Sequence, residues 1–565
     1  MGVAGNLSTL EISAKAKPQQ IYAIANKAGI HVDELEAYGH IKAKVSLKVL
    51  DRLSNRPNGK LICVTGMTPT KEGDGKTCTS IGLTEALGLL KKKVILCLRE
   101  PSLAPIFGYK GGAAGGGYAQ VLPMEDINLH FTGDIHAIEI AHNLLAAVLE
   151  NHLHYGNALR IDPEKIFWRR TLDISDRQLR DIEVGLSKSC HFAKHRTGFD
   201  ITAASEVMAA LSLSTSIHSL KAKLAKISVA LSKDGKLITA KDLKIVGAMA
   251  LLMKEAIKPN LIQTLEGQPV LMHTGPFANV SHGNNSLIAT SMALKLANYV
   301  VTESGFAVDL GLEKLFDIVC REGGIKPSVT VLVISVKALK SHSTDKDLSS
   351  KKSLDMFKWE IFKEGFANVQ RHIQSIKKFG LNVVVAINRF PDDTEEEIRI
   401  IKDYLKAHSI EHAVSDAVRQ GGKGALELAE KVLKMLSEKP GQFKPLYALG
   451  LTTEEKIEKL ATELYGASGV VYQEQAKRDL EMIHRLKLDD LPVNIAKTPY
   501  SLSDEADLKG APSGWKLKVR GIRPYTGAGF LVVLAGKMML MPGLPEKPML
   551  ENMDLSDDGQ VKGLF

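Results

Sequence analysis

The amino-acid sequence predicts an α/β fold whose main domain is a doubly wound parallel sheet, accompanied by two smaller α/β domains. Short apolar runs typical of buried strands alternate along the chain with segments of helical periodicity. The apolar runs occupy residues 61–64, 94–98, 269–273, 299–303, 328–335 and 382–387. Several runs end in glycine-rich or polar turns, and in open parallel sheets ligands bind beyond the carboxyl ends of the strands.

The turn at residues 65–77 joins the first of these runs to a helical segment, and it reads Thr-Gly-Met-Thr-Pro-Thr-Lys-Glu-Gly-Asp-Gly-Lys-Thr. Strand, glycine turn, Gly-Lys-Thr and helix is the layout of a phosphate cradle, in which backbone N–H groups and the helix N-terminus face the anion. We expect Lys76 to reach the outer phosphates and the Thr77 hydroxyl to ligate Mg²⁺. Thr70 stands where the standard spacing has glycine, so the sequence predicts a variant loop of the P-loop type.

The expected nucleotide site consists of this turn and the start of its helix. Its residues are Thr70, Gly73, Asp74, Gly75, Lys76, Thr77 and Cys78. The alternative is an ordinary strand–turn–helix with a surface lysine. It is less favoured because the strand before, the helix after and an intact Gly-Lys-Thr occur together.

Three further features favour a ligand at the same edge of the sheet. Arg99 directly follows the run 94–98, where a charged side chain can face a substrate, although a surface salt bridge is the alternative. Phe306 and Phe390 fall just beyond two other strands, which favours a flat aromatic ligand over core packing. Five glycines within residues 111–117 favour a binding loop over a flexible linker, because aromatic residues flank them.

The length of 565 residues exceeds what one hydrophobic core supports, so the sequence predicts several domains. We expect residues 1–137 and 270–390 to form a discontinuous nucleotide-binding α/β domain. Residues 138–269 are expected as a mainly helical inserted domain, and residues 391–565 as a C-terminal α/β domain.

Periodicity also places individual elements outside the main strands. Helices are expected over residues 18–28, 32–52, 138–152, 173–186, 202–211, 241–256, 355–378 and much of 451–490. A hairpin is expected from residues 226–232 and 236–239, and a strand within 527–536.

Composition narrows the class of protein. The net charge is +9, but no long basic run appears, which favours anion-binding pockets over nucleic-acid recognition. The five cysteines are widely spaced without a Cys-x-x-Cys pair, as expected for reduced thiols in the cytoplasm. Neither a signal peptide nor an 18-residue uncharged apolar run is present, so we expect no membrane span.

Long motifs in the chain resemble one enzyme family. The motifs lie at residues 98–118, 123–134, 275–279, 496–498 with 501–503, and 541–545. They resemble formate–tetrahydrofolate ligase (10-formyltetrahydrofolate synthetase) of the monofunctional type, and the likeness extends from residue 11 to residue 565.

The resemblance implies that ATP, formate and tetrahydrofolate give ADP, phosphate and 10-formyltetrahydrofolate. Formate is a weak electrophile, and phosphorylation converts it to formyl phosphate, whose carbonyl carbon the folate amine attacks. Lys76, with Gly73, Gly75 and Thr77, would hold the ATP phosphates and Mg²⁺, and Arg99 would clamp formyl phosphate as a bidentate donor. Lys76 and Arg99 are therefore the expected catalytic residues.

The resemblance also implies further binding partners. Phe306 and Phe390 would line the nucleotide and pterin pockets. The family is typically a homotetramer that a monovalent cation, K⁺ or NH₄⁺, assists. Nucleic acid and membrane are not expected partners.

The chain departs from the family pattern at several positions. Val418 stands where the family usually has a tryptophan that stacks on the folate, and losing one such stack costs roughly 1–3 kcal/mol. The other departures are Asp74 for glutamate, Cys78 for threonine, Ala104 and Ala307 for glycine, His195 and Lys337 for arginine, and His342-Ser-Thr for His-Gly-Gly. These changes bear mainly on folate binding and turnover, since Lys76, Thr77 and Arg99 are kept.

Two other functions are compatible with parts of the sequence. One is a degenerate homologue that binds nucleotide as a scaffold or regulator with weak or lost ligase activity. The other is a partition-type ATPase, because residues 71–77 resemble the variant phosphate loop of that class except at Glu72. The full-length resemblance to the ligase argues against the ATPase.

Overall fold

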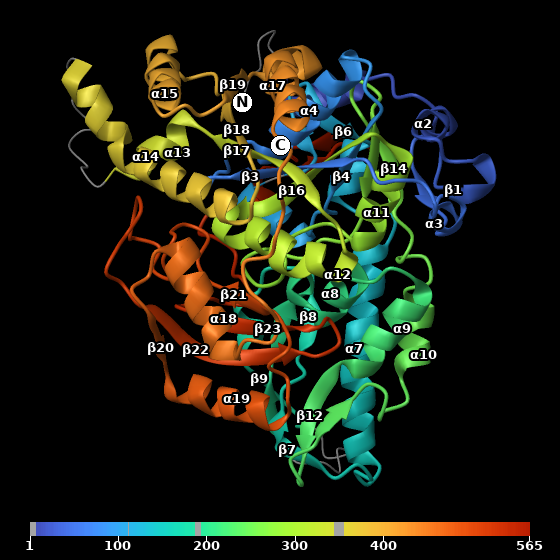
Figure 1. Cartoon of the computed structure of the whole chain (residues 1–565). Coiled ribbons are helices and arrows are strands. Elements are labelled where there is room, and N and C mark those ends of the chain that lie inside the picture. Colours follow the sequence, from blue (N-terminus) through green and yellow to red (C-terminus); the bar gives the residue numbers. More distant parts are fainter. Residues whose placement is uncertain (1–6, 111, 187–193, 344–354, 565) are drawn as a thin grey trace.

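The computed structural model describes the chain except residues 1–6, 111, 187–193, 344–354 and 565. A large sheet flanked by helices fills the upper half of Figure 1, and smaller sheets lie below it. Cys190, one of the five cysteines, and Gly111, the first residue of the glycine-rich segment, fall outside the described residues. Within the described part of the chain, no helix is long and apolar enough to cross a bilayer.

The large sheet is mostly parallel. Its parallel strands, in spatial order, are β15 (Pro269–Met272), β4 (Val94–Leu98), β16 (Tyr299–Ala307), β3 (Lys60–Gly66), β17 (Pro327–Ile334), β18 (Val383–Asn388) and β19 (His412–Ser415). The antiparallel strands β14 (Asn260–Thr264), β2 (Ala43–Val45) and β1 (Leu35–Ala37) continue the sheet beyond β15. The sequence-based expectation of an α/β fold with a large parallel sheet is confirmed.

Helices cover both faces of this sheet because its central strands are apolar on both sides. In β3, Leu61 and Cys63 face one core and Ile62 and Val64 face the other. The helices α11 (Leu287–Leu296) and α14 (Asp355–Lys378) pack in the first core, and α4 (Lys76–Leu89) and α17 (Leu426–Glu438) pack in the second. This two-sided cover is the doubly wound arrangement that the sequence predicts.

Strand order brings distant turns together. β16 lies between β4 and β3, and β17 lies on the other side of β3. The carboxyl ends of these parallel strands therefore meet at one edge of the sheet, where the order of the strands reverses. The turn after β3 is thereby placed beside the residues that follow β4, β16, β17 and β18.

Below the large sheet lies a four-stranded sheet with the order β20 (Val470–Tyr472), β22 (Leu517–Tyr525), β23 (Phe530–Ala535) and β21 (Val493–Ala496). The helices α18 (Thr453–Lys459) and α19 (Glu474–Arg485) pack against it. The strand expected within residues 527–536 is confirmed as β23. A three-stranded sheet, β13 (Leu237–Thr239), β12 (Ser228–Ser232) and β7 (Ile161–Ile166), includes the expected hairpin.

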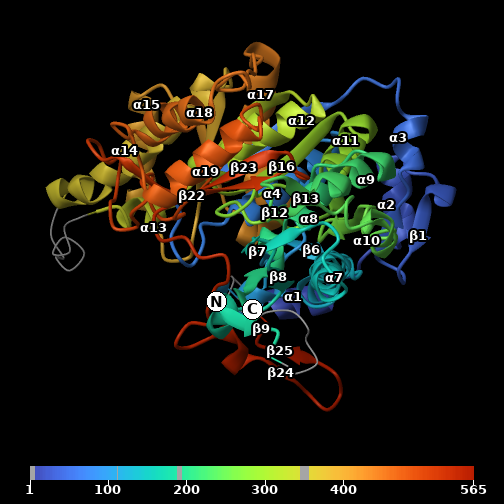
Figure 2. The ribbon, with the colours of Figure 1, turned by 90° about the horizontal axis from the view of Figure 1, so that it is seen from below.

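Several expected helices are present, with small shifts at their ends. They are α2 (Ile21–Ala28), α7 (Asp134–His154), α8 (Glu206–Ser212), α10 (Val246–Leu252) and α14. Figure 2 shows the molecule from below, with α7 seen nearly end-on and the hairpin β24 (Asp554–Leu555) and β25 (Val561–Lys562) standing apart from the four-stranded sheet.

Two expected helices are wrong. Residues 32–52 form the hairpin β1–β2 before a short helix, α3 (Lys48–Arg52), because β2 pairs with β14 and buries Lys44 against Asp134 at 2.6 Å. Residues 173–186 contain only a short 3₁₀ turn and the strand β9 (Ile182–Val184), which pairs with β10 (His195–Thr197). In both segments tertiary pairing overrides a weak helical pattern.

The division into three domains stays a prediction. The large sheet extends past two of its expected boundaries, since β14 lies within residues 138–269 and β19 lies within residues 391–565. The expected insertion also contains short strands beside its helices.

Candidate active site

The turn between β3 and α4 has the backbone of a glycine-dependent loop. Gly73 and Gly75 have φ angles of +87° and +76°, which L-residues with a side chain rarely adopt. A Cβ at Gly75 would lie 2.2 Å from the side-chain nitrogen of Asn388, whereas nothing lies within 4 Å of a Cβ built at Gly73. Gly75 is therefore required by close packing, and Gly73 faces open space.

Asp74 braces this turn from inside. Its buried carboxylate accepts hydrogen bonds from the Thr70 N–H at 2.8 Å and from the Ser335 hydroxyl at 2.9 Å. The Asn388 side-chain amide donates to the Asp74 carbonyl at 3.3 Å. Asp74 thus ties the turn to the ends of β17 and β18 and holds Thr70 in place. Contact of Thr70 or Asp74 with a nucleotide stays a prediction.

Lys76, Thr77 and Arg99 converge on Glu303. The Thr77 hydroxyl donates to one carboxylate oxygen of Glu303 at 2.7 Å, and the Arg99 guanidinium lies 3.8 Å from the other. Burial lowers the pKa of Lys76; the carboxylates of Asp74 and Glu303 act in the opposite direction. Two cationic side chains and one hydroxyl therefore lie around one acidic side chain.

The guanidinium of Arg99 is only partly satisfied. One terminal nitrogen donates to the Pro276 carbonyl at 3.1 Å, but the buried Nε has no hydrogen-bond partner among the described residues. Burial lowers the pKa of Arg99, and Glu303 opposes this shift. A buried N–H without an acceptor costs free energy, and an anion placed beside Arg99 would remove that cost.

Glu303, Ser335 and Asn388 are residues of this site that the sequence did not predict. Glu303 lies within β16, Ser335 directly follows β17, and Asn388 is the last residue of β18. The available signal is a polar residue at the end of an apolar run, the same signal that predicts a role for Arg99. Their partners could not be read from sequence, because Glu303 meets Thr77 across 226 residues.

Phe306 and Phe390 lie at the same edge of the sheet. Phe306 has a φ of +58°, an uncommon angle for an aromatic residue. Its carbonyl lies close to Gly66, at the start of the turn formed by residues 65–77, which we call the phosphate turn. The Phe390 N–H donates to the Asp393 carboxylate at 2.8 Å in the turn after β18. Backbone strain of this kind often accompanies a functional site, but contact of either ring with a ligand stays a prediction.

The glycine-rich segment packs beside the phosphate turn. Gly116 lies next to the Cys78 thiol, and burial raises the pKa of Cys78 to about 12, so this thiol stays neutral. The Tyr118 N–H donates to the Val418 carbonyl at 2.9 Å, and a Cβ at Gly117 would lie 2.2 Å from the same oxygen. The glycine loop is therefore held against the turn that carries Val418.

The other residues that depart from the family pattern form ion pairs or hydrogen bonds, or lie buried in the core. Lys337 forms an ion pair with Glu72 of the phosphate turn. His342 accepts a hydrogen bond from the Gly510 N–H at 3.0 Å, and His195 lies 3.2 Å from Glu150. Ala104 and Ala307 are fully buried.

The fold and this edge of the sheet define the class: an α/β protein with a mostly parallel sheet, in which a glycine turn and the start of a helix lie beside an arginine. A family model described as formate--tetrahydrofolate ligase matches residues 7–565. The chain therefore belongs to the formate–tetrahydrofolate ligase family, and it is an enzyme of that kind. The family uses ATP and tetrahydrofolate.

Proposed function

We propose that the chain joins formate to tetrahydrofolate by first phosphorylating formate with ATP at the turn that contains Lys76. The observation that supports this most directly is the unpaired Nε of Arg99, which lies beside Glu303 and the phosphate turn. A half-buried arginine whose buried Nε–H has no acceptor is suited to an oxyanion in a bidentate geometry.

The nucleotide would bind along the turn between β3 and α4. Gly73 leaves open space in front of the backbone, and α4 begins at Lys76, so its first N–H groups would face the phosphates. Thr70, Asp74 and Cys78 would act indirectly: Asp74 accepts from Thr70 to shape the loop, and Cys78 packs against the glycine segment. Lys76 would neutralise the transferring phosphoryl group.

The Thr77 hydroxyl and the Glu303 carboxylate fit a magnesium ion. Mg²⁺ prefers oxygen ligands from hydroxyl, carboxylate, water and phosphate groups, and these two side chains already meet at 2.7 Å. When bound there, Mg²⁺ would offset charge on the nucleotide phosphates. We therefore add Glu303 to Thr77 as a residue that would hold this metal.

Arg99 would hold formate and then formyl phosphate. Its position after β4, beside the turn after β3, would align the formate oxygen with the terminal phosphate. The guanidinium would also stabilise the oxyanion that forms when the folate amine attacks the formyl carbon. This order of steps would keep every charged intermediate at the edge of the sheet where Lys76 and Arg99 converge.

The folate would lie beside the two aromatic residues at this edge. Phe390 and Phe306 would line the pterin and nucleotide pockets, and Val418 would face the folate without the stacking that a tryptophan offers. From the family resemblance we also propose a cytoplasmic homotetramer assisted by a monovalent cation, K⁺ or NH₄⁺.

A formate-dependent assay tests the proposal. Purified chain is given ATP, Mg²⁺, formate and tetrahydrofolate, and the formation of 10-formyltetrahydrofolate is followed for the wild type, Lys76→Ala and Arg99→Ala. We expect each variant to lose about 10²-fold or more in kcat, the scale for removing one group that stabilises a transition state. The matched control is Lys92→Ala, an exposed lysine just beyond the far end of α4. Full activity in Lys76→Ala would contradict the proposal.

The degenerate-homologue alternative has its own outcome in the same assay. Phosphate release is measured with formate or tetrahydrofolate omitted in turn. A ligase releases phosphate in step with formyl transfer, whereas a nucleotide-binding scaffold shows little or no release that depends on either substrate.

A further inference from the structure

Two adjoining hollows lined by lysines lie at the amino edge of the large sheet, opposite the candidate active site. β3 begins at Lys60 and β17 begins at Pro327, and both residues line the first hollow, of about 330 Å³. The second hollow, of about 620 Å³, lies at the C-terminal end of α14. Neither hollow shares a lining residue with the candidate active site.

A short segment of backbone separates the two hollows and forms a common wall. Gly441 lines the first hollow and Gln442 lines the second. The Gln442 N–H donates to the Gly380 carbonyl at 2.8 Å, and the Lys444 N–H donates to the Phe379 carbonyl at 3.0 Å. The wall is therefore fixed to the end of α14 before any ligand arrives.

The second hollow has an excess of positive charge. Four lysines and one glutamate line it: Lys377, Lys378, Lys444, Lys459 and Glu463. Glu463 is already shared, with its carboxylate 3.1 Å from Lys459 and 3.9 Å from Lys378. Within the described part of the chain, Lys377 and Lys444 have neither a side-chain hydrogen bond nor an ion pair.

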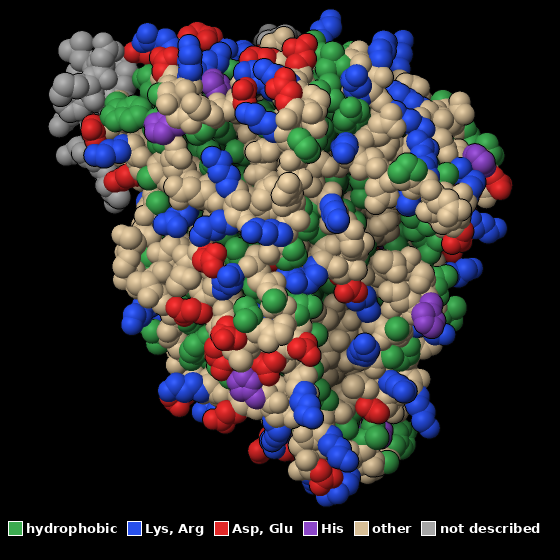
Figure 3. Space-filling model, viewed as in Figure 1, with side chains coloured by type: hydrophobic (Ala, Val, Ile, Leu, Met, Phe, Trp, Pro, Cys, Tyr) green, Lys and Arg blue, Asp and Glu red, His purple; other side chains and the backbone are tan. Residues whose placement is uncertain are grey.

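The cations in this hollow influence one another. Burial lowers the pKa of Lys378, and the neighbouring cations Arg371 and Lys459 lower it further, against the effect of Glu463. Figure 3 shows Lys and Arg side chains gathered in a band across the middle of this face. A multivalent anion would relieve this repulsion, so the hollow is suited to one.

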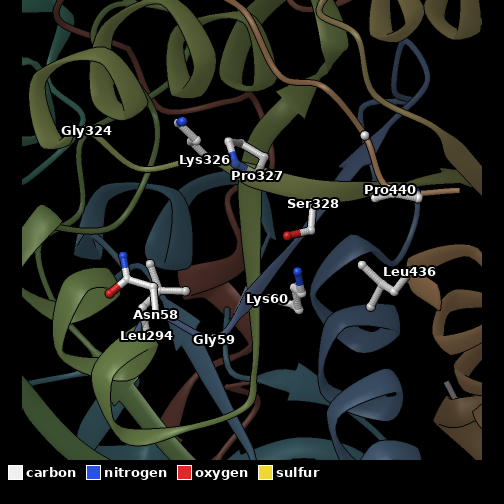
Figure 4. Close-up of a pocket in the computed structure, with 11 residues that line it drawn as sticks. Asn58, Gly59, Lys60, Leu294, Gly324, Lys326, Pro327, Ser328, Leu436 and Pro440 are labelled. Atoms are coloured by element: carbon white, nitrogen blue, oxygen red, sulfur yellow. The ribbon is translucent and has the colours of Figure 1, made fainter. Parts of the chain in front are cut away.

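The first hollow continues the same chemistry. Lys60 and Lys326 line it together with Ser328 and Asn58, and its lining contains no carboxylate. Figure 4 shows the amino group of Lys60 directed toward the hydroxyl of Ser328. Both groups can donate to one oxyanion.

The lining excludes some anions as the natural ligand. Neither hollow has an aromatic side chain in its lining, and single-stranded nucleic acid is held by aromatic stacking as well as by charge. Lysines act as point charges and suit phosphate groups that carry no base.

We propose that the second hollow is a binding site for a compact polyphosphate, either free or as the phosphate chain of a nucleotide. Lys377 and Lys444 hold the phosphates there, and Lys60 and Lys326 add positive charge from the other side of the wall. This site is separate from the turn at Lys76 and does not depend on the function proposed for that turn.

Calorimetric titration with tripolyphosphate at low ionic strength tests the site. All proteins carry Lys76→Ala, which keeps the phosphate turn from contributing. We expect Lys377→Ala with Lys444→Ala to weaken binding at least about tenfold, because two unpaired cations are removed. The matched control, Lys402→Ala with Lys406→Ala, removes two exposed lysines from α15 (Glu395–Ala407) and is expected to bind as the parent does.

Equal weakening in both double variants would overturn the proposal, because it would indicate general attraction to a chain of net charge +9. Unchanged binding in Lys377→Ala with Lys444→Ala would overturn it as well. A second titration with ATP distinguishes the two sources of the phosphate chain: similar affinity for ATP and tripolyphosphate supports a site that contacts phosphates alone. An affinity for ATP more than tenfold higher would contradict it.

Discussion

Replacing Asp74 is the sharpest test of how the phosphate turn is built. The carboxylate is 4% exposed and accepts from the Thr70 N–H at 2.8 Å and from the Ser335 hydroxyl at 2.9 Å. Asp74→Ala leaves both donors without this acceptor. Each unsatisfied buried donor costs about 1–3 kcal/mol, and the Thr70 N–H is only partly buried, so we expect a total loss of about 2–4 kcal/mol.

The sizes of the losses in related variants separate the effect of the hydrogen-bond geometry of Asp74 from the effect of its charge. Asp74→Asn keeps one oxygen acceptor, so we expect it to lose about half as much as Asp74→Ala. Ser335→Ala removes a single partner, and its combination with Asp74→Ala forms a double-mutant cycle with an expected coupling of about 0.5–3 kcal/mol. A coupling of zero would show that the contact between the two side chains does not stabilise the turn.

Two measurements test the predicted effect of replacing Asp74. Urea denaturation gives the free energy of unfolding, and steady-state kinetics gives the KM for ATP, which we expect to rise as the turn loses its brace. A loss smaller than about 0.5 kcal/mol, the size of an ordinary surface substitution, together with an unchanged KM would refute the reasoning.

Three further predictions concern other parts of the chain. Val418→Trp restores a stacking surface, so we expect folate affinity to rise by about 1–3 kcal/mol in a fluorescence titration, whereas Val418→Leu should leave it unchanged. Burial and the nearby Glu266 raise the pKa of Glu85 to about 8. Because the Glu85 carboxyl binds its proton more tightly in the folded protein, the folded protein loses stability as pH rises from the unfolded pKa of this group to about 8. We therefore expect Glu85→Gln to reduce the dependence of the urea midpoint on pH over that range. Asp489 and Glu454 raise the pKa of His484. The contribution of His484 to the free energy of unfolding should be complete below the unfolded pKa of 6.5 and should disappear at higher pH. His484→Gln should remove this pH dependence and should change the free energy of unfolding by less than about 1 kcal/mol, because the site is exposed.

The sequence predicted the elements whose signals are local. The strand, turn and helix of β3 and α4 were recognisable because the two glycines, Lys76 and Thr77 lie close together in the chain and the flanking strand and helix have clear periods. The helix α14 was predicted with its observed ends for the same reason. Both depend on neighbours within a few residues, which a single sequence displays.

What the sequence did not predict depends on partners far along the chain. Residues 32–52 have a helical pattern, yet β2 pairs with β14, more than two hundred residues later. Glu303 looked like the last residue of an apolar strand, and only the strand order placed it between Thr77 and Arg99. Pattern reasoning identifies which residues are polar at a strand end, but topology decides which of them meet.

The position of Glu303 links the two halves of the proposed reaction. Its carboxylate contacts Thr77, which would help hold the metal, and faces Arg99, which would hold formyl phosphate. Without ligands, one buried negative charge partly balances the cations around it. An anion bound at Arg99 would leave Glu303 free to neutralise a metal at Thr77, so nucleotide and formate would each favour the other's binding. This positive cooperativity is measured as a coupling free energy between the two ligands. We expect Glu303→Gln to reduce the coupling free energy, while each ligand still binds in the absence of the other. Equal synergy in wild type and Glu303→Gln, measured by titrating formate with and without a non-hydrolysable ATP analogue, would show that the coupling runs through other residues.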